Sequence, residues 1–240
     1  MKTVVLDLET IADRCAMARC GYQEEEGAFA PWPLHRIVCA STLTVCRTRT
    51  DDLSFDLRSY SLKDMSERAI AASVERAAES ADRIITYNGR GFDIPVLLAR
   101  AILADEHVPT LARLGHRCRP GLHHDLHEQI KGTGGGIKLA HLCATFSIPA
   151  KIGAVGDNVA ELTAKENWSA IEHYCETDVI ATWLASEMWE SSENPGYGRS
   201  RWTLLARWLR SRPQDNPKLA AFCEVPSRAA SSIPAAEVAF

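Results

Sequence analysis

Apolar positions cluster along this chain in short runs that predict five strands. The β-branched, apolar run at residues 3–8 is typical of a buried strand. A polar turn at 48–52 separates two longer runs, and another short run ends at Asn88-Gly89, which is a turn signal. The five strands are expected at residues 3–8, 36–47, 53–60, 83–87 and 123–126.

Apolar residues at helical spacing predict four helices between and after these strands. The segment 61–81 is rich in Ala, Glu and Arg, and Pro95 stands in the first turn of another helix, where proline is favoured. Gly, Pro and a run of three glutamates predict a long loop at 12–35. The helices are expected at residues 61–81, 95–104, 138–146 and 168–189.

The order of these elements predicts an α/β fold. Three strands precede the first helix, so the chain lacks the strict strand–helix alternation of a doubly wound nucleotide-binding domain. We therefore expect a mixed five-stranded sheet with helices on both faces. The composition changes at Asn194, which predicts a main domain at 1–195, a basic and aromatic helical extension at 196–224, and a disordered tail at 225–240.

Composition and charge are those of an ordinary globular protein. Of the 240 residues, 46% are hydrophobic and 24% are charged, and the formal net charge is −4. This charge does not by itself indicate nucleic-acid binding, although an enzyme that grips one strand end needs only a local basic rim. No apolar run approaches the ~18 residues of a membrane span, and no signal peptide is visible, so we expect a cytoplasmic protein without membrane contact. The eight cysteines form no C-x-x-C pair and are expected to be reduced.

Three groups of acidic residues are candidates for a metal site. Asp7 and Glu9 alternate on the first strand and point to the same face, where repulsion and lost hydration favour a divalent cation. Alternatively, the strand ends at Asp7 and both acids are solvated. Asp93 precedes a helix and could cap it, with or without a catalytic role. Tyr174 and Asp178 are four apart on a helix and share a face, as a core tyrosine and an acid at its edge would also do.

These groups occur in an order that resembles a known superfamily. The chain reads V-V-L-D-L-E-T, then Y-N-G-R-G-F-D-I-P, then Y-C-E-T-D-V. These segments resemble the three motifs of the DEDD exonucleases, in the subtype with tyrosine called DEDDy. L-H-R-I-V-C-A-S, H-D-L and K-L-A-H-L-C-A-T-F-S-I-P-A-K also resemble bacterial predicted 3′–5′ exonucleases related to the proofreading domain of polymerase B. The resemblance covers about residues 1–190 and implies a DnaQ-like, RNase H-like fold.

The resemblance implies hydrolysis of nucleic acid with two divalent ions, Mg²⁺ or Mn²⁺. Asp7 would bridge both ions, Glu9 and Asp178 would complete the site of the water-activating ion, and Asp93 would help to hold the second. The products would be 5′-mononucleotides from 3′ ends of single-stranded DNA or RNA. Tyr174 would orient the attacking water, since its ordinary pKa of ~10 makes full proton abstraction less credible. The expected substrate contacts are Thr10, Asn88 and Phe92, although Asn88 could equally serve only as a turn former.

A histidine beside the tyrosine leaves a second subtype open. His173 precedes Asp178 by five residues, which matches the histidine-type motif H-x(4)-D. On a continuous helix, however, Tyr174 lies about 40° from Asp178 around the axis and His173 about 140° away. We therefore favour Tyr174 and expect His173 to be solvated.

Several weaker patterns have less specific meanings. The glycine-rich segment 132–136 lacks the G-K-[ST] ending of a phosphate-binding loop and is interpreted as a flexible loop. Asp125 is expected to be structural. The segment 199–212 could grip nucleic acid, but packing of its Trp and Leu face with solvated arginines is favoured. A zinc site is conceivable, but unsupported by spacing, among His116, Cys118, His123, His124 and His127.

Three rival functions remain from sequence, and one of them is a soluble scaffold whose acids only cap elements and face solvent. A non-catalytic nucleic-acid-binding module on the same fold would be expected to lack one of the carboxylates, and a phosphodiesterase would prefer very short oligonucleotides. We expect a standalone exonuclease, so that any polymerase or repair partner acts in trans. The sequence leaves the oligomeric state open.

Overall fold

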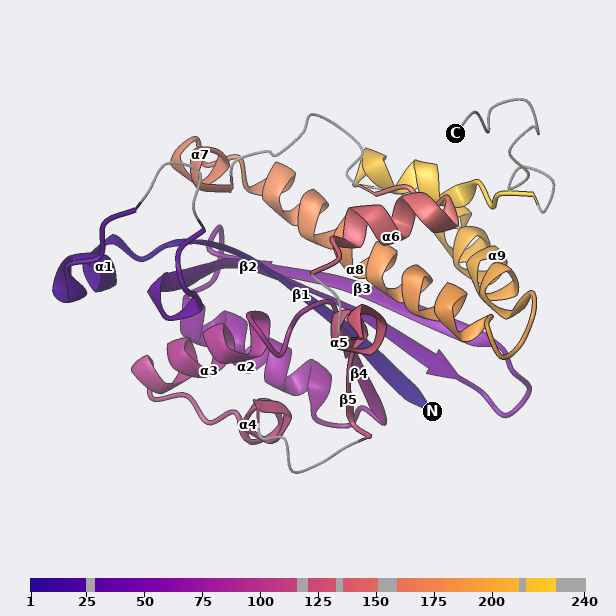
Figure 1. Cartoon of the computed structure of the whole chain (residues 1–240), viewed down its shortest axis with the longest axis horizontal. Coiled ribbons are helices and arrows are strands. Elements are labelled where there is room, and N and C mark those ends of the chain that lie inside the picture. The colour runs from indigo at the N-terminus through magenta and orange to yellow at the C-terminus, as the bar shows by residue number, and fades with distance from the viewer. Residues whose placement is uncertain (25–28, 116–120, 133–135, 151–158, 212–214, 228–240) are drawn as a thin grey trace.

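The structure is a computed structural model of the whole chain (Figure 1). The structure describes residues 1–24, 29–115, 121–132, 136–150, 159–211 and 215–227. The expected tail at 225–240 falls mostly outside these residues.

A five-stranded mixed sheet forms the centre of the molecule, in the order β3-β2-β1-β4-β5. β1 pairs antiparallel with β2 and parallel with β4, β2 pairs antiparallel with β3, and β4 pairs parallel with β5. The expected α/β fold with a mixed sheet is therefore confirmed. The strands are β1 (Lys2–Ala12), β2 (His35–Arg47), β3 (Leu53–Ser61), β4 (Arg83–Thr86) and β5 (His123–Asp125).

Alternation along β1 sends successive side chains to two separate cores. Val4 and Leu6 lie in a cluster with residues of α2 (Glu67–Ala78) and α3 (Asp93–Leu103). Val5 lies in the other cluster, with residues of α8 (Trp168–Glu190) and α9 (Tyr197–Arg210). Helices consequently cover both faces of the sheet, with α2 and α3 on one side and α8 and α9 on the other (Figure 1).

Shorter helices complete the two layers, and several of them were not expected. α6 (Leu139–Phe146) matches the prediction, and the 3-10 turn η2 (Pro217–Cys223) falls inside the expected helical extension at 196–224. The prediction does not contain α4 (Pro109–Gly115), α5 (Leu126–Lys131), α7 (Val159–Ala164) or the 3-10 turn η1 (Trp32–Leu34). The expected loop at 12–35 contains α1 (Arg14–Cys20). Asp13 caps the first turn of α1 and Gly21, at φ 67°, ends it. α1 escaped prediction because it buries only Met17 and therefore has no apolar stripe.

α9 packs against the sheet-covering helix α8 and shares its core. Trp202 is almost fully buried and its indole N–H donates to the carbonyl of Phe222 at 2.8 Å. Gly198 lies so close to α8 that an added Cβ would stand 2.7 Å from the Glu187 carbonyl oxygen. The favoured interpretation of this segment as a packing helix is confirmed.

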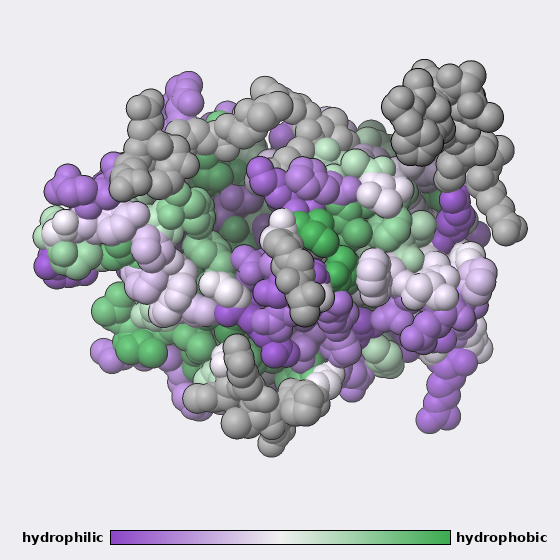
Figure 2. All heavy atoms as spheres, in the orientation of Figure 1, coloured by the Kyte–Doolittle hydropathy of each residue, from purple (hydrophilic) through white to green (hydrophobic). Residues whose placement is uncertain are grey.

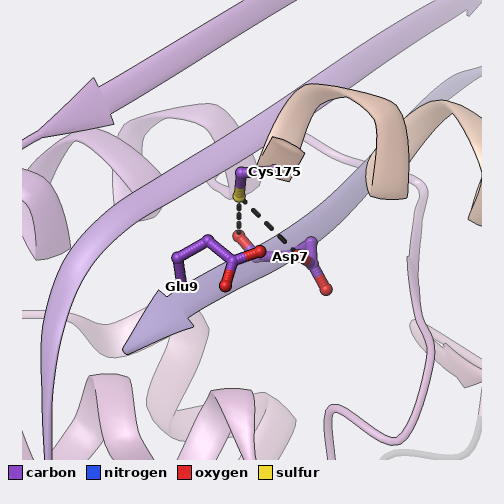
Figure 3. A group of neighbouring side chains, drawn as sticks. All are labelled: Asp7, Glu9 and Cys175. Atoms are coloured by element: carbon purple, nitrogen blue, oxygen red, sulfur yellow. Dashed lines mark hydrogen bonds between the residues drawn. The ribbon is translucent and has the colours of Figure 1, made fainter. Parts of the chain in front are cut away.

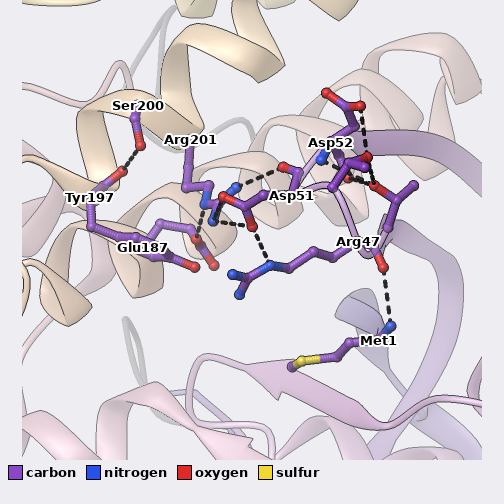
Figure 4. Close-up of polar contacts among 10 residues, drawn as sticks. Met1, Arg47, Asp51, Asp52, Glu187, Tyr197, Ser200 and Arg201 are labelled. Carbon is purple, nitrogen blue, oxygen red and sulfur yellow. Dashed lines mark hydrogen bonds and ion pairs between the residues drawn. The ribbon is translucent and has the colours of Figure 1, made fainter.

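The expectation that all arginines of this helix are solvated is wrong for Arg201. Arg201 is only 4% exposed, and its guanidinium donates two hydrogen bonds to the carboxylate of Asp51, at 2.9 and 3.0 Å. Arg47 pairs with the same carboxylate, and Glu187 lies 4.0 Å from Arg201 Nε (Figure 4). Asp51 sits in the turn between β2 and β3, so this network anchors α9 to that turn, a partnership between distant segments that helical spacing cannot reveal.

Two neighbouring apolar residues are exposed at the end of α3. Ile102 and Leu103 are 72% and 69% exposed, and Figure 2 shows an apolar patch at the end of α3. Among the residues that the structure describes, no helix combines the length and apolar character needed to cross a bilayer.

Candidate active site

The first two acids lie on the face of β1 that α8 covers. Side chains at alternate positions of a strand point to the same face. Asp7 and Glu9 therefore point to the α8 side of the sheet, as Val5 does. β1 runs past the end of its parallel neighbour, because the last β1–β4 pair is Val5 with Ile85. Both acids therefore stand beyond the carboxyl end of β4, where the sheet opens on that side. Glu9 is 8% exposed and Asp7 is half-buried.

Asp93 reaches the same place through the turn that follows β4. The backbone N–H groups of Asn88 and Arg90 donate to the two carboxylate oxygens of Asp125, at 2.9 and 2.8 Å. α3 then begins at Asp93, and the Leu8 N–H donates to Asp93 Oδ1 at 3.1 Å. Leu8 lies beyond the part of β1 that pairs with β4, so the carboxylate takes the place of a strand partner. The structural role expected for Asp125 is confirmed by these bonds.

α8 brings the fourth acid, Asp178, over β1. The Cys175 thiol lies 3.5 Å from the Asp7 carbonyl oxygen and 3.7 Å from Asp7 Oδ2, so this face of α8 meets β1 (Figure 3). At about 100° per residue, Asp178 lies about 60° and Tyr174 about 100° from Cys175, on the same side of the helix. His173 lies about 160° from Cys175, on the side away from β1.

Hydrogen bonds on the other side of α8 fix this rotation of the helix. Ser61 donates to Glu172 at 2.5 Å and Ser59 donates to Glu176 at 3.1 Å, so these glutamates face β3. Tyr174 and Asp178 consequently face the opposite edge, toward β4. The half-buried His173 instead offers its backbone carbonyl to Asn216 Nδ2 at 3.0 Å.

The acids perturb one another strongly. The pKa of Asp7 is raised well above its ordinary value, by burial first and then by repulsion from Asp93, Asp178 and Glu9. Burial also raises the pKa of Asp93 to about 7, against the opposing effect of backbone N–H donors and with a further rise from Asp125. A site that raises carboxylate pKa values in this way favours neutralisation by a cation.

The donor set fits a divalent metal ion. Ligand atoms of Asp7, Glu9 and Cys175 all lie within 4.8 Å of one another. Among the described residues, no arginine or lysine forms an ion pair with Asp7 or Asp93. Carboxylate oxygens are the ligands that Mg²⁺ and Mn²⁺ prefer. Burial raises the pKa of the Cys175 thiol well above its ordinary value, so this group stays protonated and serves as a donor to Asp7.

Two of the three expected substrate residues line a pocket beside Glu9. This pocket has a volume of about 480 Å³ and is lined by Thr10, Phe92 and Phe29 among others. Asn88 is not among its lining residues; it is exposed and adopts φ 63°, and its carbonyl accepts from the N–H groups of Gly91 and Phe92. The role of Asn88 as a turn former, left open by the sequence, is therefore observed.

Sequence reasoning missed three residues of this region. Cys175 lies in the Y-C-E-T-D-V segment, but nothing in the motif indicates that its thiol contacts Asp7. His35 and Phe29 both lie in the segment expected to be a loop or at its end. His35 Nδ1 is 2.9 Å from Thr10 Oγ1, and the rings of His35 and Phe92 are 5.0 Å apart. The one available sequence signal was a histidine directly before the expected strand at 36–47.

The structure adds little evidence that the weaker sequence patterns have a function. His116, Cys118 and the glycine-rich residues 133–135 lie outside the described residues. Within the described part, His123 is buried and hydrogen-bonds Thr86 Oγ1 at 2.9 Å, and no histidine belongs to a group that could hold a metal ion. A more apolar pocket of about 570 Å³ borders α3 and α4, but it contains none of the clustered acids.

Comparisons with known proteins place the chain in a family. A family model described as a predicted 3′–5′ exonuclease related to the exonuclease domain of PolB matches residues 27–224. The family B DNA polymerase from the hyperthermophilic archaeon Pyrobaculum calidifontis is similar over 92% of this chain, with 14% sequence identity and a TM-score of 0.56. Product-bound exonuclease I is similar over 88% of this chain and 48% of its own length, with 12% identity and a TM-score of 0.49. A search of curated proteins found no match.

These matches cover only part of the similar structures. The chain spans 27% of the length of the polymerase, and the likeness at this identity shows a shared fold. The family match includes Asp93, Tyr174 and Asp178 but begins after Asp7 and Glu9. The family model's description names a predicted 3′–5′ exonuclease, and the polymerase match adds only the shared fold. The chain belongs to the family of predicted 3′–5′ exonucleases related to the exonuclease domain of PolB.

Proposed function

We propose that the protein is a two-metal exonuclease of the DEDDy subtype that removes 5′-mononucleotides from the 3′ end of single-stranded nucleic acid. One observation carries the proposal. Asp7 and Glu9 from β1, Asp93 from the start of α3, and Asp178 from α8 converge on one buried, negatively charged place. The raised pKa of Asp7 reflects that convergence, because three of its causes are the other carboxylates.

The four carboxylates would hold the two ions together. Asp7, Glu9 and Asp178 would bind one ion, and Asp93 would help to hold the other. Bound there, the ions would generate the attacking hydroxide and neutralise charge on the leaving oxygen. Asp93 is held for this role by the Leu8 N–H, while the Asp125 carboxylate fixes the preceding turn.

Tyr174 is the residue proposed to orient the attacking water. Its position on the Asp178 side of α8 puts it next to the acids, whereas His173 lies on the side away from β1. The Lys218 ammonium lies 5.8 Å from the centroid of the Tyr174 ring, which adds a positive charge on this side. An orienting role requires only hydrogen bonding by the phenol hydroxyl, not transfer of a proton.

The substrate side of the proposal rests on the pocket beside Glu9. Thr10 and Phe92 line this pocket, so an apolar ring and a hydroxyl adjoin the acids, and the ion pair of Arg14 with Glu24 borders the same pocket. A pocket of about 480 Å³ is of a size that suits a single nucleotide unit. The overall negative charge of the chain is consistent with a grip on one strand end only.

A nuclease assay tests the proposal directly. Single-stranded DNA and RNA labelled at the 5′ end should be shortened stepwise with Mg²⁺ or Mn²⁺, and EDTA should stop the reaction. Asp7→Asn should abolish turnover, whereas Asp56→Asn, an exposed acid on β3 paired with Arg58, should not affect it. Degradation that continues in EDTA or in Asp7→Asn would contradict the proposal. Cleavage of a dinucleotide but not of a twenty-nucleotide strand would instead indicate a short-oligonucleotide phosphodiesterase.

A further inference from the structure

The pocket beside Glu9 has one wall built from three aromatic rings. The Phe29 ring lies 4.6 Å from the His35 ring and 5.2 Å from the Phe92 ring, measured between centroids. The His35 and Phe92 rings meet edge to face, at 5.0 Å and 80°. The three rings come from different segments: Phe29 precedes η1, His35 opens β2, and Phe92 precedes α3. They therefore form a platform that only the folded chain assembles.

Phe29 is the exposed member of this platform. It is 71% exposed, while Phe92 is half-buried and His35 is 5% exposed. A phenyl ring that stays in water gains little stability for the fold, because the hydrophobic contribution scales with the apolar area removed from solvent. The same ring lines the pocket that holds Glu9 and Thr10. A flat apolar ligand that covered Phe29 would remove its ring from water and gain this hydrophobic free energy on binding.

Hydrogen bonds of His35 fix the direction of the Thr10 hydroxyl. His35 Nε2 lies 3.0 Å from the carbonyl oxygen of Ala30, which can only accept, so Nε2 carries the proton. Burial lowers the pKa of His35, which keeps the ring neutral, and Nδ1 is then an acceptor. The Thr10 hydroxyl, 2.9 Å away, must therefore donate to Nδ1. Its oxygen keeps lone pairs that can accept a hydrogen bond from the pocket.

A nucleoside consists of a flat base and a sugar that carries hydroxyl groups. The aromatic platform suits the base and the Thr10 oxygen suits a sugar hydroxyl, and both lie next to the acids. We infer that Phe29 and His35 build the subsite of the 3′-terminal nucleoside. Phe29 stacks on the base, and His35 holds the Thr10 hydroxyl so that its oxygen accepts a hydrogen bond from a sugar hydroxyl. This inference rests on the proposed exonuclease function. His35 acts through Thr10 and is a positioning residue, whereas Phe29 contacts the substrate.

The stacking role is tested with Phe29→Ala on strands with and without a terminal base. Base–aromatic stacking predicts that KM for a normal strand rises ~5- to 150-fold while kcat changes little. For a strand that ends in an abasic nucleotide, wild type and variant should have the same KM. Trp189→Ala, which removes another exposed aromatic ring at the far end of α8, is the matched control and should change neither value. An unchanged KM in Phe29→Ala, or an equal rise on the abasic strand, would overturn the stacking role.

The hydrogen-bonding role is tested by removing hydroxyls from both partners. Strands that end in a ribonucleotide, a 2′-deoxynucleotide or a 2′,3′-dideoxynucleotide differ only in the sugar hydroxyls. Wild type should discriminate against the dideoxy end by ~2- to 12-fold in kcat/KM, as one net hydrogen bond allows. Thr10→Val and His35→Ala should lose this discrimination, and His35→Gln, which keeps one donor and one acceptor, should regain it. The deoxy strand then shows whether the 3′-hydroxyl suffices or the 2′-hydroxyl is needed.

A binding measurement separates failure of this inference from failure of the proposed function. Binding of adenosine 5′-monophosphate and of its 2′,3′-dideoxy analogue can be followed by calorimetry with the Asp7→Asn variant, which needs no turnover. Binding that Phe29→Ala weakens in this background supports the subsite even if wild type degrades no strand. Strand degradation without any effect of Phe29 or His35 variants refutes the subsite and leaves the exonuclease function standing.

Discussion

The clustered acids should make the metal-free protein less stable as the pH rises, and Asp93→Asn should relieve this effect. Asp93 has a pKa of about 7 in the folded protein against an ordinary value of 3.8. A carboxyl group with a raised pKa binds its proton more tightly in the folded state than in the unfolded state. The stability that the protonated Asp93 carboxyl group contributes to the fold is therefore fully present below about pH 4 and is lost as the pH rises to about 7.

The size of the effect follows from the shift. A rise from 3.8 to about 7 corresponds to a free energy of unfolding lower by on the order of 4 kcal/mol at pH 8 than at acidic pH. Asparagine removes the charge but keeps an oxygen that can accept the Leu8 N–H. For a chain of this size, about 2–4 °C of melting temperature per kcal/mol predicts that Asp93→Asn melts on the order of 10 °C above wild type.

Thermal unfolding in EDTA across a pH series measures this difference. Asp93→Asn should match wild type near pH 4 and exceed it increasingly toward pH 8, whereas Asp56→Asn should follow wild type throughout. Added Mg²⁺ should raise the melting temperature of wild type at pH 8 and raise that of Asp93→Asn less, because the variant has lost one ligand. If Asp93→Asn is no more stable than wild type at pH 8 in EDTA, then burial does not raise the pKa of Asp93 as argued.

Three further outcomes follow from the packing of α8 and α9. Tyr174→Phe should lower kcat by ~10²- to 10⁴-fold, while His173→Ala should leave it unchanged, as measured by initial rates on a single-stranded substrate; the reverse result would favour the histidine subtype. Trp202→Ala should lower the free energy of unfolding by about 3–5 kcal/mol in denaturant titration, because it empties a buried site and removes a hydrogen bond to Phe222. Gly198→Ala should also destabilise the protein in the same titration, since its Cβ would stand 2.7 Å from backbone atoms of α8, and unchanged stability would mean that the two helices separate without cost.

The sequence by itself determined the five strands, the longer helices and the candidate acids. Runs of β-branched residues such as Thr3–Leu6 place the strands because local side-chain preference and burial agree there. The order of the acidic motifs then indicated the superfamily, and alternation on β1 already put Asp7 and Glu9 on one face. Short helices such as α1 were not predicted, because they bury too few apolar residues to show a helical spacing in the sequence.

Only the tertiary structure decided what surrounds these acids. Asp93 meets β1 because β4 is parallel to β1 and shorter, which leaves the Leu8 N–H for a carboxylate. Cys175 against Asp7 and Arg201 against Asp51 join segments more than a hundred residues apart. The sequence pattern shows which side chains point to the same face of a helix or strand. Which distant element they then meet depends on strand pairing and helix rotation, and those are set by the packing of the whole core.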